Sequence, residues 1–138
     1  MILFVCTGNT CRSPMAAALL RAQGKDACSA GTAVRPGDPA TPAAVRTAAR
    51  HGIDLASHRA QPVTEALMAQ AEQVYTMTEW HAAVLRTRFP AQAAKVRVLQ
   101  PMIPDPYGGD DGVYEECLQT ILTALERIGR PESADDAW

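Results

Sequence analysis

The chain has 138 residues, with 13 lysines and arginines against 15 aspartates and glutamates, and its net charge is −2 at pH 7. This length suits one domain, and the near-neutral charge excludes a strongly basic surface for nucleic acid or for membranes. The four cysteines form no dense disulfide pattern, and the apolar run Ile2 to Cys6 is too short for a signal or a membrane span. We therefore expect free thiols, a cytoplasmic location, and neither a nucleic acid nor a membrane among the partners.

The first predicted element is a strand over Ile2 to Val5, which is uniformly apolar, as in a parallel strand that is buried on both faces. A polar loop follows it. The next predicted element is a helix that Ser13 caps, that has Pro14 in its first turn and that ends at Gly24. A short strand near Ala27 to Ala30 and a loop rich in glycine and proline come next.

The rest of the chain alternates in the same way. The predicted elements are a helix from about Ala43 to His51, a short helix capped by Thr64, a strand from Gln73 to Met77, a helix capped by Thr78 and stopped by Pro90, a strand from Val96 to Leu99, and a helix from about Val113 to Ile128. This alternation predicts a single α/β domain over residues 1–130, doubly wound, with a four-stranded parallel sheet flanked by helices. A mobile C-terminal tail is expected over residues 131–138. In such a fold the functional cleft lies at the carboxyl ends of the strands.

The loop CTGNTCR lies at such an end, directly after the first strand. It offers successive backbone N–H groups, and Gly8 and Asn9 tolerate the positive φ that a concave anion-binding nest needs. Arg12 adds a planar fork of donors that can bind two oxygens of a phosphoryl group. These donors and the start of the following helix would stabilise a thiolate at Cys6. The loop therefore predicts a nucleophile that faces phosphorus.

The sequence does not match the patterns of nucleotide-binding, redox or zinc sites that use the same residue types. The nucleotide-binding pattern GxxxxGK[ST] and the redox pattern CxxC are both absent. A zinc site is disfavoured because Cys6 and Cys11 have no histidine nearby in the sequence. The three histidines, His51, His58 and His81, are scattered and are expected at the surface or as capping residues. We expect neither a metal nor a cofactor.

A phosphatase also needs an acid for the leaving group, and IPDPYGG supplies Asp105 between Pro104 and Pro106. This loop follows the last predicted strand, so it lies at the same edge of the sheet as the Cys6 loop. The prolines restrict the approach of the carboxyl group. Asp105 can then protonate the departing atom and activate the water that hydrolyses the phosphorylated thiol.

These motifs resemble the low-molecular-weight protein-tyrosine-phosphatase family over nearly the whole chain. The likeness is carried by VCTGNTCRSPMA, by SAG at residues 29–31, by HGIDLASHRAQ at residues 51–61 and by IPDPYGG. It implies the fold of that family, with Cys6 as nucleophile, Arg12 as phosphoryl ligand, Asp105 as general acid, Ser13 as hydrogen-bond donor to the thiolate and Asn9 as the residue that shapes the loop. Thr7, Gly8, Thr10 and Cys11 complete the phosphate-binding loop. The likeness gives His58 a structural role.

Three features bear on the phosphoryl group that is cleaved. Thr10 replaces the Ile or Leu that tyrosine phosphatases of this family usually carry, and Tyr107 is followed by two glycines instead of a second aromatic residue. No Phe, Trp or Tyr occurs between Phe4 and Tyr75, so the aryl clamp is incomplete. Thr10 with DPYGG resembles the bacterial protein arginine phosphatases, which hydrolyse the P–N bond of phosphoarginine. We expect a phosphorylated protein as the partner, with phosphoarginine preferred and phosphotyrosine as the alternative.

Two other classes that share the loop fit less well. A thioredoxin-coupled arsenate reductase needs a further pair of cysteines, and the stretch VYTMTEWHAAV has none. A non-catalytic phosphate-binding module would lack Cys6, Arg12 or Asp105, and all three are present. The chain is expected to be a monomer. Cys11 is expected either to capture an oxidised Cys6 as a disulfide or to be an inert packed thiol.

Overall fold

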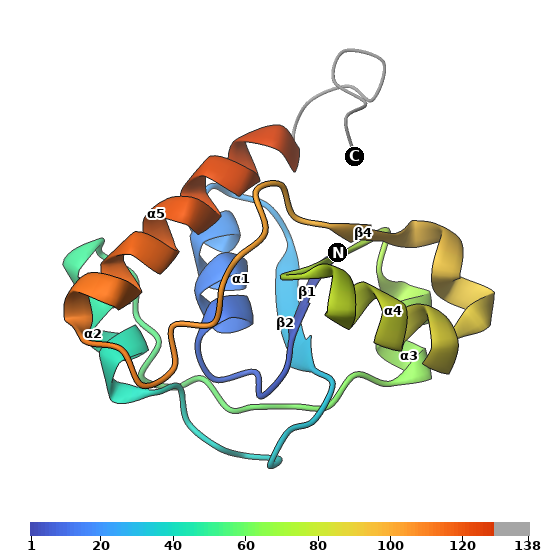
Figure 1. Cartoon of the computed structure of the whole chain (residues 1–138), viewed down its shortest axis with the longest axis horizontal. Coiled ribbons are helices and arrows are strands. Elements are labelled where there is room, and N and C mark those ends of the chain that lie inside the picture. Colours follow the sequence, from blue (N-terminus) through green and yellow to red (C-terminus); the bar gives the residue numbers. More distant parts are fainter. Residues whose placement is uncertain (129–138) are drawn as a thin grey trace.

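The computed structural model describes residues 1–128, in which strands and helices alternate as the sequence predicts (Figure 1). In chain order the elements are β1 Ile2–Cys6, α1 Arg12–Ala22, β2 Ala27–Gly31, α2 Pro42–Arg50, α3 Glu65–Gln70, β3 Gln73–Thr76, α4 Glu79–Arg88, the 3₁₀ helix η1 Pro90–Lys95, β4 Val96–Val98 and α5 Asp111–Ile128. The tail predicted over residues 131–138 lies outside the described residues. None of the described helices is long and apolar enough to cross a membrane.

The four strands form one parallel sheet in the order β2-β1-β3-β4, which confirms the predicted architecture. β1 is central, and its last residue, Cys6, lies opposite Gly31 at the end of β2. On the other side Val5 lies opposite Thr76 at the end of β3. The carboxyl ends of β1, β2 and β3 therefore meet at one edge, and the loop after Cys6 starts there.

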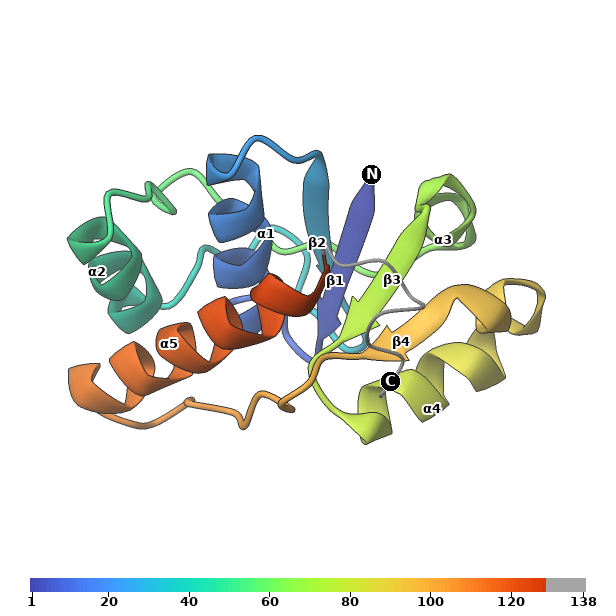
Figure 2. The same cartoon turned by 90° about the horizontal axis from the view of Figure 1, so that it is seen from above.

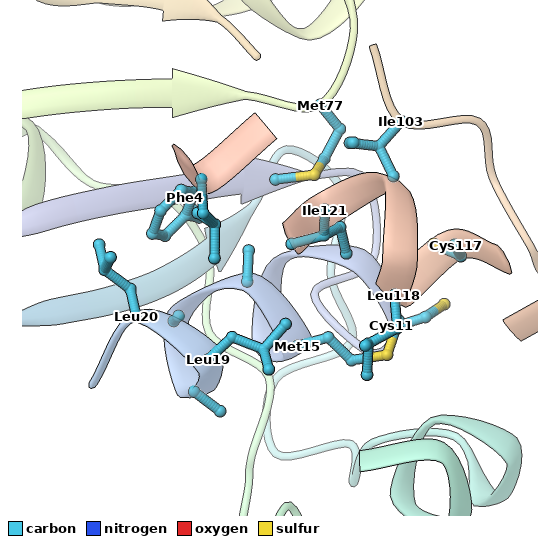
Figure 3. Packing of buried hydrophobic residues seen from close by; sticks show 14 of the residues in the cluster. Phe4, Cys11, Met15, Leu19, Leu20, Met77, Ile103, Cys117, Leu118 and Ile121 are labelled. Carbon is cyan, nitrogen blue, oxygen red and sulfur yellow. The ribbon is translucent and has the colours of Figure 1, made fainter. Parts of the chain in front are cut away.

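Two helical layers cover the sheet (Figure 2). α1, α2 and α5 lie on one face, and α3 and α4 lie on the other. Side chains alternate along β1, so Phe4 packs with the first layer while Leu3 and Val5 pack with the second. Figure 3 shows the first core, in which Phe4, Met15 and Leu118 are among the buried residues. The burial of β1 on both faces explains its uniformly apolar sequence.

The start of α1 differs from the prediction. The helix begins at Arg12, and Cys11 before it makes no side-chain capping bond. The predicted cap, Ser13, lies inside the first turn, so the prediction is wrong. Its hydroxyl is instead recruited by the neighbouring loop, where it contacts Cys6 and Asn9.

The other predicted helix signals are confirmed. The hydroxyl of Thr64 accepts a hydrogen bond from the Leu67 N–H at 3.1 Å, and the hydroxyl of Thr78 accepts one from the His81 N–H at 3.4 Å. Gly24 follows α1 with a φ of 87°, the left-handed conformation that glycine adopts without steric cost.

Candidate active site

The loop that follows Cys6 wraps closely over the end of β2. The N–H of Thr32 donates to the Cys6 carbonyl at 2.9 Å, and the N–H of Ala33 donates to the Thr7 carbonyl at 3.0 Å. A Cβ atom added to Gly31 would collide with the Thr7 carbonyl oxygen and with the Val34 side chain. Position 31 must therefore be glycine for the loop to lie this close to the sheet.

Asn9 holds the loop from inside, and it is fully buried. Its Nδ2 donates to Ser13 Oγ at 2.8 Å and to Ser29 Oγ at 2.9 Å, while its Oδ1 accepts from the Gln61 N–H at 3.0 Å. Its carbonyl accepts from His58 Nε2 at 2.7 Å, so His58 carries its proton on that nitrogen. These four bonds tie Asn9 to three segments, at Ser13, at Ser29 and at residues 58–61, and so fix the loop against the fold.

The turn of the loop depends on Asn9 and not on Gly8. Asn9 has a φ of 57°, whereas Gly8 is not among the residues with positive φ. Of the two residues that the sequence analysis finds tolerant of a positive φ, Asn9 is therefore the one that adopts it. Asparagine tolerates the left-handed region better than most residues, and here its side-chain bonds compensate for the strain.

Cys6 is 2% exposed and its Sγ lies 2.9 Å from Ser13 Oγ. Since Asn9 donates to the same Oγ, the Ser13 hydroxyl is an acceptor there and keeps its own proton for another partner. The Ala30 carbonyl lies 3.5 Å away, which is a much longer contact than the one to sulfur. The geometry therefore lets Ser13 donate to the Cys6 sulfur and stabilise it as a thiolate.

Arg12 and Asp105 come from opposite ends of the chain and meet at the same edge of the sheet. The Arg12 side chain is almost fully buried, and its Nη1 donates to the Ile103 carbonyl at 3.0 Å. Its Nη2 lies 3.9 Å from Asp105 Oδ2. Asp105 is 56% exposed, and its Oδ1 accepts from the Tyr107 N–H at 3.0 Å. The Asp105 loop is thus attached to the guanidinium at two points.

A cleft of about 190 Å³ opens over these groups. It is lined by Cys6, Thr7, Gly8, Thr10, Cys11, Arg12, Asp105 and Tyr107. Every residue that the sequence predicts for the site lines this cleft, except Asn9 and Ser13, which lie directly beneath it. The structure therefore brings together the predicted nucleophile, phosphoryl ligand and acid.

Two further thiols lie near Cys6. Cys11 is buried in the first core with Met15 and Leu118 (Figure 3), and burial together with the neighbouring Cys6 raises its pKa. Burial raises the pKa of Cys117 in α5 to about 12. Both side chains are therefore protonated thiols at neutral pH, and neither competes with Cys6 as the nucleophile toward phosphorus.

The histidines fit the prediction only in part. His51 lies at the end of α2 with its Nε2 2.9 Å from Glu115 Oε2, which agrees with a surface position. His81 is only 2% exposed, so the expectation of a surface or capping residue is wrong for it. Its Nε2 lies 2.8 Å from Thr7 Oγ1 and its Nδ1 lies 2.8 Å from Thr78 Oγ1.

His81 is the site residue that the sequence analysis missed. The available signal was its place three residues after the capping Thr78, in the helix that starts where β3 ends at the functional edge. Burial, and then the charge of Arg12, lower its pKa to about 4, although Asp105 acts in the opposite direction. The ring is therefore neutral at physiological pH.

Within residues 1–128 no group of three or more His, Cys, Asp or Glu side chains is placed to hold a metal ion. The polar groups around Cys6 are instead amides, hydroxyls and a guanidinium, which suit a phosphoryl group.

Comparison with known proteins gives consistent matches. Residues 1–131 match the family described as "Low molecular weight phosphotyrosine protein phosphatase". A probable low molecular weight protein-tyrosine-phosphatase EpsP from Ralstonia nicotianae is 42% identical, with 91% of this chain and 90% of the relative covered. A protein-arginine-phosphatase from Bacillus subtilis is 33% identical, with 97% of each covered.

Solved structures agree with these matches. A mutant YwlE arginine phosphatase with a phosphorylated active-site serine superposes with a TM-score of 0.89 at 33% identity. The superposition covers 97% of this chain and 96% of that one.

Proposed function

Because this chain belongs to the low molecular weight phosphotyrosine protein phosphatase family, whose members are cysteine-dependent protein phosphatases, we propose that it hydrolyses phosphoarginine in proteins through a phosphocysteine intermediate. The observation that carries the proposal is the cleft in which the Cys6 sulfur, the Arg12 guanidinium and the Asp105 carboxyl group converge. Thr10 at its wall supports the choice of phosphoarginine.

In the first step the Cys6 thiolate attacks phosphorus and forms the S–P bond while the bond to the leaving group breaks. The loop amides and Arg12 bind the phosphoryl oxygens, whose charge they stabilise in the transition state. Asp105 gives its proton to the departing nitrogen, so the arginine side chain, whose guanidinium group is already charged in the substrate, leaves as a guanidinium cation. Asp105 is then a carboxylate.

In the second step a water molecule attacks the phosphorus of the phosphocysteine. The Asp105 carboxylate takes a proton from this water, the P–O bond forms and the S–P bond breaks. Inorganic phosphate leaves, and Ser13 donates to the regenerated Cys6 thiolate. The enzyme returns to its first state without a metal or an external reductant.

Phosphoarginine is supported by the polarity of the cleft wall. Thr10 lines the cleft, and its side chain is more polar than the Ile or Leu that would offer an apolar contact to a phenyl ring. Among the described residues that line the cleft, Tyr107 is the only aromatic one, and it is 76% exposed. A charged, hydrated guanidinium needs no aryl clamp, and the carboxylate that Asp105 becomes after it gives up its proton offers the leaving guanidinium an ionic partner.

Phosphotyrosine is the second candidate. It is favoured by the 42% identity to a probable tyrosine phosphatase, compared with 33% to the arginine phosphatase from Bacillus subtilis. The Tyr107 ring is the structural feature that could contact a phenyl group.

The deciding experiment measures kcat/KM of the wild type and of Thr10→Ile on matched phosphoarginine and phosphotyrosine peptides. The added methyl and methylene groups should reduce kcat/KM for phosphoarginine and raise it for phosphotyrosine, because they replace a polar wall with an apolar one. A side-chain change of this size is worth about 10–200-fold in discrimination. Thr10→Ser is the matched control, since it keeps the hydroxyl, and it should retain the preference for arginine.

Two outcomes would favour phosphotyrosine instead. One is a higher kcat/KM of the wild type on the phosphotyrosine peptide. The other is a parallel loss of both activities in Thr10→Ile, because a disturbed loop harms every phosphoryl substrate alike.

We also propose that the protein is a cytoplasmic monomer whose partner is a phosphorylated protein and not a nucleic acid. The net charge of −2 and the four free cysteines support this proposal. Size-exclusion chromatography with light scattering tests the monomer.

A further inference from the structure

A chain of three side chains connects the helix α4 to the phosphate-binding loop. The imidazole of His81 lies between two hydroxyl groups, with Nδ1 2.8 Å from Thr78 Oγ1 and Nε2 2.8 Å from Thr7 Oγ1. Thr7 directly follows the nucleophile Cys6 and lines the cleft with it. The roles proposed for Cys6, Arg12 and Asp105 assign no function to these hydrogen-bonded side chains.

The cap of α4 favours one direction for the two hydrogen bonds of the His81 ring. Thr78 Oγ1 accepts the backbone N–H of His81, so its own hydroxyl proton is available for the imidazole Nδ1. A neutral imidazole that accepts at Nδ1 carries its proton at Nε2 and donates it to Thr7 Oγ1. The Thr7 hydroxyl is then an acceptor toward His81 and must direct its own proton elsewhere.

Within residues 1–128 the Thr7 hydroxyl has no other hydrogen-bond partner. The cleft that Thr7 lines is therefore the place for an acceptor, and the phosphoryl oxygens bound there are strong acceptors. We propose that Thr7 donates a hydrogen bond from its hydroxyl to the phosphoryl group held above Cys6, and that His81 is the positioning residue that turns this proton into the cleft.

The surroundings of His81 keep the arrangement in one state. The ring is enclosed, with the Trp80 ring at 5.4 Å as an edge contact, and the nearby charge of Arg12 opposes a second positive charge. A protonated imidazole would donate at both nitrogens, and the Thr78 hydroxyl would have to turn away. In the neutral ring, Nδ1 accepts the proton of the Thr78 hydroxyl and Nε2 donates its own proton to the Thr7 hydroxyl.

The inference rests on the proposed role of Cys6 and is independent of the choice between arginine and tyrosine. Calorimetry tests it by measuring the affinity for inorganic phosphate in the Cys6→Ser background, where the nucleophilic thiol is absent. Thr7→Val keeps the shape of the side chain without the hydroxyl and should weaken phosphate binding about 10–150-fold, the usual range for losing a hydrogen bond to a charged group. Thr7→Ser should retain the affinity.

The role of His81 is tested by two substitutions that introduce amide side chains of different length. His81→Gln places an N–H donor near the position of Nε2 and should keep most of the affinity, whereas His81→Asn is too short to reach Thr7 and should lose it. In a double-mutant cycle, His81→Asn should add no further loss to Thr7→Val, because both remove the same hydrogen bond. Losses that add, or a Thr7→Val protein that binds phosphate like its parent, would overturn the proposal.

The tautomer gives a test that needs no substitution near the loop. Nitrogen chemical shifts of the imidazole in the unsubstituted protein should show the proton on Nε2 of His81. A proton on Nδ1 would make Thr7 the donor to the ring and would leave no proton for the cleft. Thr47→Val is the matched control for removal of a buried threonine hydroxyl, since Thr47 lies in α2, and its phosphate affinity should equal that of the parent.

Discussion

Arg12 Nη2 lies 3.9 Å from Asp105 Oδ2, so the proposed phosphoryl ligand and the proposed acid are neighbours before a substrate enters. The guanidinium is held by its bond to the Ile103 carbonyl, and Ile103 lies two residues before Asp105. The position of the Asp105 carboxyl group therefore depends on Arg12, the residue proposed to bind the phosphoryl group. This coupling explains how a loop from the end of the chain meets the nucleophile of the first strand in a defined position.

Asp105→Asn should lower kcat/KM on a phosphopeptide by about 10²–10⁴, because an amide cannot protonate the leaving group. The loss on p-nitrophenyl phosphate should be smaller, since p-nitrophenolate leaves without a proton. Steady-state kinetics on both substrates measures the difference. Equal losses on the two would assign Asp105 to the binding of the phosphoryl group instead of to proton transfer.

Arg12→Lys should be severely impaired although the positive charge is retained. A lysine ammonium can neither bind two phosphoryl oxygens in one plane nor keep the bond to the Ile103 carbonyl in the same geometry. We expect a higher KM and a lower kcat together, because the group acts in both the ground state and the transition state. Kinetics close to those of the wild type would contradict the role.

The sequence predicted most of the fold because each strand and helix carried its own local signals. β1 is apolar throughout since helices cover both of its faces, and Thr64 and Thr78 precede helices that they cap. Ser13 shows the limit of such signals. It has the sequence of a cap, but its hydroxyl bonds to a thiol that lies seven residues earlier, and local propensity contains no information on that contact.

The site was predictable where its chemistry is concentrated in one loop and unpredictable where it depends on distant partners. Cys6 and Arg12 belong to one short motif, and Asp105 follows from the topology of a parallel sheet. The contact of His81 with Thr7 joins residues 74 positions apart. The four bonds of Asn9 likewise involve three other segments, which no spacing within the loop reveals.

Oxidation by hydrogen peroxide should inactivate the enzyme reversibly through Cys6 and Cys11. The Cys6 thiolate attacks the peroxide and becomes a sulfenic acid, and the Cys11 sulfur then displaces water to form the disulfide. Both thiols line the cleft. Activity after peroxide and then dithiothreitol should recover in the wild type and in Cys117→Ser, but not in Cys11→Ser, whose sulfenic acid is oxidised further. Full recovery of Cys11→Ser would identify Cys11 as an inert packed thiol.

Acidification should destabilise the fold through His81. Burial and Arg12 lower the pKa of His81 from 6.5 in the unfolded chain to about 4 in the folded one. Between these two values the unfolded chain binds a proton that the folded chain does not, so the free energy of unfolding falls as the pH drops from about 6.5 to about 4. Urea denaturation at a series of pH values should show a shallower fall in His81→Gln than in the wild type.

Other groups titrate in the same range, so the difference between the two proteins is the informative quantity. Burial also lowers the pKa of His58, and its contribution to the slope has the same sign. The double variant His81→Gln with His58→Gln should therefore show a flatter pH dependence than either single variant. Parallel curves for the wild type and His81→Gln would mean that His81 takes up its proton in the folded protein as readily as in the unfolded chain, and the neutral ring between Thr7 and Thr78 would then be wrong.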